Sequence, residues 1–284
     1  MHTMHFGSAP RRVPLSLQVV NFFNGFSQIG WLLFGFGMIF FWAFTFNADL
    51  SFVTFRGPHE TVDGKVMHVE STNASENEMP VHAHHYEYSV AGTLHGGTSY
   101  STGDSLSAGE TVTVEYDQGD PSRSRIEGMR RALFGPWVVL VNLFPFIGLA
   151  LMIPATITGL KRNRLLRDGL IAQGKLVSKE ATNITINDRP LYELGFEFTA
   201  RDGKHYVAKA RATDTARLQD ESREPLLYDP ADPTRAYVLD EAPARPEFEP
   251  GGELRGNPVR AIRATILPLI VIVAHGWVLW TKLT

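Results

Sequence analysis

The sequence predicts an α+β membrane protein with three transmembrane helices and two small duplicated antiparallel β-domains, each a barrel or a sandwich. The first observation behind this prediction is a set of three long apolar stretches without Asp, Glu, Lys or Arg, at residues 18–46, 133–160 and 264–280. The second is that the two polar regions between these stretches repeat one another at a nearly constant offset. The mean hydropathy of −0.09 is therefore an average over membrane and non-membrane parts.

The apolar stretches are long enough to cross a bilayer, which takes about 20 apolar residues. We expect transmembrane helices at residues 29–50, 133–160 and 264–281. The first stretch is longer than the apolar core of a signal peptide, so we expect it to remain as a helix. Residues 1–28 are expected to hold an interfacial amphipathic helix, because four amide side chains recur there at spacings of three and four: Gln18, Asn21, Asn24 and Gln28.

The second stretch contains Pro145 and Pro154, so it could also be a hairpin that returns to its own side of the membrane. At about 1.5 Å of rise per residue, its 28 residues give about 42 Å of helix. That length suits one crossing, and two half-crossings would leave backbone groups unsatisfied in lipid. We therefore favour a single crossing.

Basic residues near the ends of the spans predict the orientation, because Lys and Arg are retained on the cytoplasmic side. They precede the first span, follow the second and precede the third: Arg11, Arg12, Lys161, Arg162, Arg164, Arg167, Arg255, Arg260 and Arg263. We expect a multi-pass protein of the bacterial inner membrane with a cytoplasmic N-terminus, an outer loop at 50–130 and an inner loop at 161–260. Arg130 and Arg131, just before the second span, argue against this orientation.

The repeat predicts two β-domains, at residues 55–130 and 165–242, followed by a linker at 243–262 that is rich in Pro, Gly and Glu. Each matched block reads as a strand, since Val66, His68 and Glu70 alternate with the residues between them. The offset of 110 to 112 residues across the blocks indicates a duplication. The matched blocks are 63–70 with 173–180, 86–92 with 196–203, and 112–126 with 224–238.

Three features of these blocks resemble a known family: a Gly-Lys-Val type strand, an aromatic-x-aromatic strand, and the ending YDQGDP at 116–121 or YDPADP at 228–233. They are similar to the bacterial membrane-protein family known only as domain of unknown function 3592, here in two tandem copies over 60–128 and 170–240. YDQGDP departs from the pattern by losing its first proline. The resemblance implies a small β-domain held at a membrane by flanking helices, and it implies no activity and no functional residues.

Histidines in the first polar region form a candidate metal site. His82 and His84 alternate on one expected strand, and His68 lies on a neighbouring one, so the three could bind zinc or copper. The alternative is that they are solvent-facing strand positions, which we favour because most histidines bind nothing. The matching stretch of the second region, PLYELGFEF, contains no histidine.

Other polar residues are expected to be structural. The aspartates of the two YDxxDP endings should cap backbone amides in turns: Asp117, Asp120, Asp229 and Asp232. His275, inside the third span, should be a neutral imidazole bonded to a helix carbonyl or a residue near the interface. Gly35 and Gly37 should permit close helix packing with partners in the membrane.

Composition and motifs limit the function classes. The net charge of −3 does not indicate the excess of basic residues that is typical of nucleic-acid-binding proteins. The absence of cysteine excludes disulfides and thiolate chemistry. Without a recognisable catalytic motif, we expect a non-catalytic accessory or scaffold subunit without a cofactor, which binds the bilayer and other membrane-protein subunits or itself. The alternatives are an envelope metal-binding or sensor protein that uses the histidines, and a membrane enzyme or transporter component.

Overall fold

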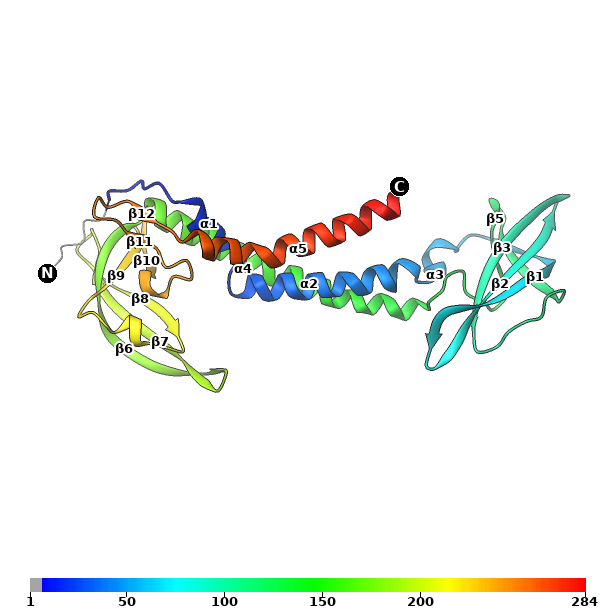
Figure 1. Ribbon diagram of the computed structural model, residues 1–284, viewed down its shortest axis with the longest axis horizontal. Helices are drawn as coiled ribbons and strands as arrows, with labels where there is room; N and C mark the ends of the chain where they lie inside the picture. The colour runs from blue at the N-terminus through cyan, green and yellow to red at the C-terminus, as the bar shows by residue number, and fades with distance from the viewer. Residues whose placement is uncertain (1–6) are drawn as a thin grey trace. The chain divides into compact units, whose positions relative to one another are not determined.

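The structure, a computed structural model, describes residues 7–284 and divides into two compact units. One is Phe36–Pro145, and the other joins the residues up to Gly35 with Phe146–Thr284. Each unit contains one five-stranded antiparallel sheet (Figure 1). The α+β class is therefore confirmed, with two antiparallel sheets and three long apolar helices.

The first β-domain is the sheet of the Phe36–Pro145 unit, with strand order β3-β2-β1-β4-β5. Its core is made by alternate side chains of these strands, including Val66, Tyr86, Val114 and Ile126. The strands are β1 His59–Glu76, β2 Met79–Val90, β3 Thr93–Thr102, β4 Thr111–Asp117 and β5 Asp120–Ile126.

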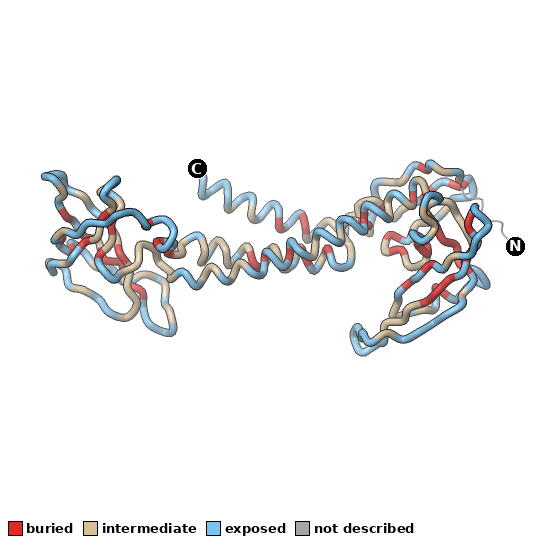
Figure 2. The backbone as a smooth tube through the Cα atoms, turned by 180° about the vertical axis from the view of Figure 1, so that it is seen from behind, coloured by how far each residue is buried: buried red, intermediate tan, exposed pale blue. Residues whose placement is uncertain are grey.

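The second β-domain has strand order β10-β9-β6-β7-β8, which is the same path read from the other edge. Its core includes Leu194, Phe196, Leu226 and Val238. Most of the core residues of both β-domains lie on strands, and buried positions are coloured red in Figure 2. The strands are β6 Leu170–Ile186, β7 Arg189–Thr199, β8 His205–Ala212, β9 Glu224–Asp229 and β10 Asp232–Val238, and a separate two-stranded ribbon pairs β11 Glu247–Phe248 with β12 Leu254–Arg255.

The long first strand of each β-domain is irregular at equivalent places. In β1 the register shifts between Val66 and His68, and in β6 it shifts between Leu176 and Ser178, 110 residues later. A second shift, at 71–75 in β1 and at 181–185 in β6, has the same offset. Bulges of this kind bend a strand and increase its twist. The two sheets therefore share their local geometry as well as their strand order.

The expected barrel is not closed. Each β-domain is one curled five-stranded sheet, and no ladder joins its edge strands in the part of the chain that the structure describes. In the first β-domain the edges meet through a side chain instead, since the Ile126 amide donates to Ser99 Oγ at 2.9 Å. Ser99 is fully buried, so this contact lies inside the curl.

Three helical segments are long and apolar enough to span a membrane: Phe26–Asn47, Pro136–Asp168 and Pro258–Leu283. Most of α5 is exposed, as the pale blue of Figure 2 shows. The helices are α1 Leu15–Phe22, α2 Phe26–Ala43, α3 Ser51–Thr54, α4 Leu143–Asp168 and α5 Pro258–Leu283, with short 3-10 turns η1 Thr45–Asn47, η2 Pro136–Asn142, η3 Ala216–Leu218 and η4 Leu239–Glu241.

Two of these helices extend beyond the expected spans for local reasons. α5 begins at Pro258, before the expected residue 264, because Asn257 caps it by accepting from the amides of Val259 and Arg260. α4 continues past the apolar stretch to Asp168, so its last two turns are basic. Both extensions add charged turns to an apolar helix.

Glycines permit close helix contacts within the chain. A Cβ on Gly30 of α2 would lie 2.8 Å from the carbonyl oxygen of Gly148 in α4, and one on Gly35 would lie 2.5 Å from Val271 of α5. The expected close packing at Gly35 therefore serves this chain's own helices, and it is no sign of an outside partner.

The amides expected on an interfacial helix have partners within the protein. The Asn21 side chain donates to Asn163 Oδ1 at 2.7 Å, and Gln28 donates to the Ala264 carbonyl at 2.6 Å. On α1, Leu17 and Val20 are buried against Leu166 and Leu227. This short helix thus packs on α4 and the second β-domain.

Candidate functional site

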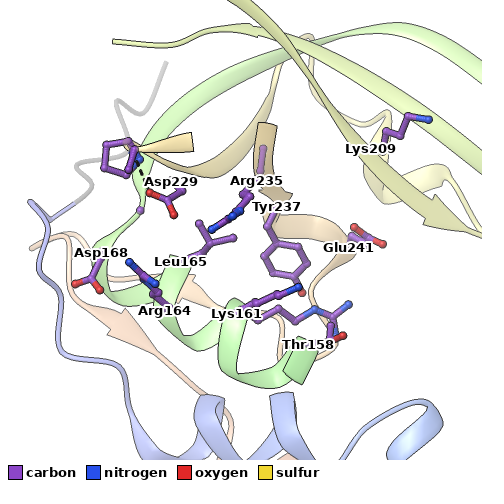
Figure 3. Close-up of a pocket in the computed structure, with 15 residues that line it drawn as sticks. Thr158, Lys161, Arg164, Leu165, Asp168, Lys209, Asp229, Arg235, Tyr237 and Glu241 are labelled. Carbon is purple, nitrogen blue, oxygen red and sulfur yellow. Dashed lines mark hydrogen bonds between the residues drawn. The ribbon is translucent and has the colours of Figure 1, made fainter. Parts of the chain in front are cut away.

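A basic pocket lies where α4 meets the turn between β9 and β10 (Figure 3). Its volume is about 620 Å³. Five basic and three acidic side chains are among those that line it: Lys161, Arg162, Arg164, Lys209 and Arg235 with Asp168, Asp229 and Glu241. We call this cavity the basic pocket. Its excess of positive side chains favours a negatively charged ligand.

The helical period places the α4 side chains in the pocket. Lys161, Leu165 and Asp168 recur at spacings of four and three, so they lie on one face of the helix. The apolar stretch ends at Leu160, directly before this basic segment. The pocket therefore spans the end of the apolar part of the helix, from Thr158 onward.

The basic residues of α4 and those of the strands differ in their pairing. Lys209 forms an ion pair with Glu193 at 2.7 Å, and Arg235 forms one with Asp232 at 2.9 Å. Within residues 7–284, Lys161, Arg162 and Arg164 lie within 4.0 Å of no carboxylate oxygen. These three cations of α4 are thus available to a ligand.

Tyr237 is the buried polar group of the pocket. Only 6% of it is exposed, and its hydroxyl has no hydrogen-bond partner among the described residues. Figure 3 shows its ring directed from β10 toward Lys161 on α4. The Arg162 guanidinium lies 5.1 Å from the centre of this ring. Burial raises the pKa of Tyr237, so the hydroxyl keeps its proton and can donate it in a hydrogen bond.

Glu241 closes one side of the pocket. Burial raises the pKa of its carboxyl group, and the Arg211 backbone amide and the Arg162 charge act in the opposite direction. The Tyr237 hydroxyl has no hydrogen-bond partner among the described residues, and Arg162 lies beside it. A free donor next to cations can hold an oxyanion such as a phosphate group.

The three histidines of the expected metal site are not brought together. Val66 pairs with Tyr86, but His68 pairs with His85, because Met67 is an extra residue in the bulge. His68 therefore shares a face with His85, whose ring stacks on it at 5.9 Å, and not with His84. Among the residues described, His68, His82 and His84 do not bring three ligand atoms within 4.8 Å of one another.

His84 is a buried residue of the first β-domain. It has no exposed surface, and its Nε2 accepts a hydrogen bond from the Leu106 amide at 3.1 Å. Burial lowers the pKa of His84, so the neutral ring is the native form. His82 is half-buried on the same strand and pairs with Ser71.

A pH dependence of the first β-domain follows from His84. Because its folded pKa is lowered, its neutral form contributes stability that is present above the ordinary histidine pKa of about 6.5 and is lost as the pH falls below it. We expect hydrogen-exchange protection of β2 amides to drop between about pH 7.5 and about pH 5.5, and to drop less in His84→Asn. His205→Asn, at an exposed position of the second β-domain, is the control. An equal drop in all three proteins would contradict the assignment.

The structural predictions for the other polar residues are confirmed. Asp117 Oδ1 accepts from the Gly119 amide at 2.8 Å, and Asp229 Oδ1 accepts from the Ala231 amide at 3.0 Å. Asp120 and Asp232 cap the amides two residues later in the same way. The His275 ring donates from Nε2 to the Gly35 carbonyl at 3.0 Å.

The pocket was not predicted from the sequence, although some of its basic residues form a recognisable pattern there. Lys161, Arg162 and Arg164 follow an apolar span, which we used only to predict orientation. Tyr237 carries no local signal, because its position opposite α4 depends on the tertiary fold.

The fold and the pocket define a class of protein: β-domains attached to helices that can span a membrane, with a cationic cavity at the end of one such helix. Residues 62–131 match the family model described as domain of unknown function (DUF3592). This match covers most of the first β-domain, so the resemblance is confirmed for one copy. Neither the curated proteins nor the solved structures include a match to this chain.

Proposed function

We propose that this protein is a non-catalytic accessory subunit of a membrane-protein assembly, placed in the bacterial inner membrane as a multi-pass protein. Its helices and β-domains bind other membrane proteins. Its basic pocket binds the phosphate group of an anionic lipid. The observation that carries this proposal is the position of the basic pocket, whose lining from α4 begins at Thr158 near the end of the apolar stretch and continues through Lys161, Arg162 and Arg164.

The position of the pocket supports a lipid as the source of the phosphate group. Leu160 ends the apolar stretch, and Lys161 and Arg162 follow on the next turn, where headgroups lie if α4 crosses a bilayer. Basic pockets at the ends of membrane helices bind anionic headgroups in this way. The Tyr237 hydroxyl would then supply a neutral donor among the cations.

The orientation we propose keeps the N-terminus and the second β-domain in the cytoplasm. The basic segment of α4 supports it. Arg130 and Arg131 oppose it. Arg130 donates to both carboxylate oxygens of Glu76 at 2.7 Å, and Arg131 lies over the Phe55 ring at 4.9 Å. The basic residues that follow the apolar stretch of α4 outnumber these two: Lys161, Arg162, Arg164 and Arg167.

We also propose that the second β-domain is a tandem copy of the first. The shared strand order, the two bulges at an offset of 110 and the paired Asp caps support this. A side chain at the second bulge repeats as well, because Thr72 Oγ1 donates to the Val81 carbonyl and Thr182 Oγ1 donates to the Leu191 carbonyl, each at 2.8 Å.

A native pull-down of the tagged full-length protein in mild detergent tests the function. We expect stoichiometric membrane-protein partners that also recover this protein in the reciprocal pull-down. We expect anionic phospholipid in the same eluate, detected by lipid mass spectrometry. A protein that elutes alone and free of lipid would contradict the proposal.

A further inference from the structure

Three carboxylates of the second β-domain come together at the start of β9, and none of them lines the basic pocket. One oxygen each of Asp220, Glu224 and Asp240 lies within 4.8 Å of the other two. Glu224 is 1% exposed, whereas Asp220 is exposed and Asp240 is half-buried. The cluster is therefore buried at Glu224 and open to solvent at Asp220.

Glu224 is not satisfied by the protein. Its Oε1 accepts only a long hydrogen bond of 3.4 Å from the Glu221 amide, and its Oε2 is buried without a partner among the described residues. A buried carboxylate without a partner is costly. Burial raises the pKa of Glu224 to about 7, and the neighbouring Asp240 and Asp220 raise it as well.

The fold does not require a carboxylate at this position. Glu224 pairs with Gly174 in the second β-domain, and the equivalent pair in the first is Val112 with Gly64. Val112 packs against the apolar core of its sheet. The same backbone position thus accepts a valine, and the buried acid of the second β-domain needs another reason.

We propose that Asp220, Glu224 and Asp240 bind a hard divalent cation, calcium or magnesium. All three supply carboxylate oxygens, the ligands that both ions prefer. Arg217 pairs with one oxygen of Asp240 at 2.7 Å, which leaves two net negative charges for the ion to balance. The exposed side at Asp220 leaves room for the water ligands that both ions retain. This site is separate from the basic pocket and does not rest on the proposed function.

Thermal unfolding of the full-length protein in detergent, stripped with a chelator and titrated with calcium or magnesium chloride, tests the site. We expect a saturable rise in Tm of the wild type with one of the two ions. Glu224→Gln and Glu224→Val should abolish this rise, whereas Glu180→Gln, an exposed acid on β6, should keep it. Without the ion, Glu224→Val should be at least as stable as the wild type, because valine fits the equivalent position.

Calorimetric titration with the same salts gives a readout that does not depend on core substitutions. Asp220→Asn changes an exposed ligand, so the protein should fold normally and bind the ion at least about tenfold more weakly, as expected when a ligand charge is lost. A wild-type protein that releases no heat and has an ion-independent Tm would overturn the proposal. Glu224 and Asp240 would then share a proton.

Discussion

Replacing Arg162 by glutamine is expected to weaken binding of an anionic phospholipid by roughly tenfold to a hundredfold, because a charge-assisted hydrogen bond to a phosphate contributes about 1.5–3 kcal/mol. Arg162 has no carboxylate partner within 4.0 Å and lies over Tyr237. The substitution therefore breaks no ion pair among the described residues, although it removes the contact of the guanidinium with the Tyr237 ring. Native mass spectrometry of the detergent-solubilised protein, titrated with anionic lipid, measures the change.

A second variant and two controls complete this test. Tyr237→Phe should also weaken lipid binding, while the lipid-free protein stays as stable as the wild type, because the deleted hydroxyl has no partner within residues 7–284. Lys175→Gln, at an exposed position of β6 outside the pocket, should bind lipid normally. Inorganic phosphate distinguishes a free anion from a headgroup. Equal lipid affinity in all the variants would contradict the assignment of the pocket.

A single cysteine at Asp104 is expected to react with an impermeant maleimide in intact cells, and a single cysteine at Lys204 only after the cells are permeabilised. The chain has no cysteine, so there is no background labelling. Asp104 follows β3 and Lys204 precedes β8, and both are exposed. One crossing by the second apolar stretch places these two positions on opposite sides of the membrane.

The labelling result also decides between a crossing and a hairpin. Labelling of both cysteines in intact cells would contradict a single crossing by the second apolar stretch. It would favour a hairpin that returns this stretch to the side of the membrane on which it began. A cysteine at Ser105 should behave like the one at Asp104, which checks that the label reports the side and not a local shielding effect. The surface residues replaced here leave the sheets unchanged.

The existence of the long helices and the caps at strand ends can be predicted from the sequence, because their signals are local. Helix bounds are predicted less closely, since α4 begins at Leu143 after a 3-10 segment at Pro136–Asn142 and not at residue 133. An uncharged apolar stretch predicts each long helix, and the Asp117 and Asp229 caps depend only on residues two positions away. The missed helix start at Pro258 was also visible, since an asparagine before a proline is a strong helix beginning.

The arrangement of the histidines could not be predicted in this way. Strict alternation puts Val66 and His68 on one face, but the bulge at Met67 separates them. The basic pocket and the carboxylate cluster could not be predicted for a related reason. Tyr237 meets Arg162, and Asp220 meets Asp240, only after strands and helices distant in sequence have packed. Residue spacing along the chain carries no record of such contacts.

The extra residue in each long strand has a consequence for how this fold can vary. Met67 and Val177 are the unpaired residues of the first bulges, and both are about half exposed, at 52% and 51%. Their side chains can therefore be exchanged freely. Their presence cannot, because removing either residue would keep the pairs on both sides in register and delete the bulge, so that the strand loses its bend and extra twist. In related chains, length at these two positions should be preserved even where the residue type is not.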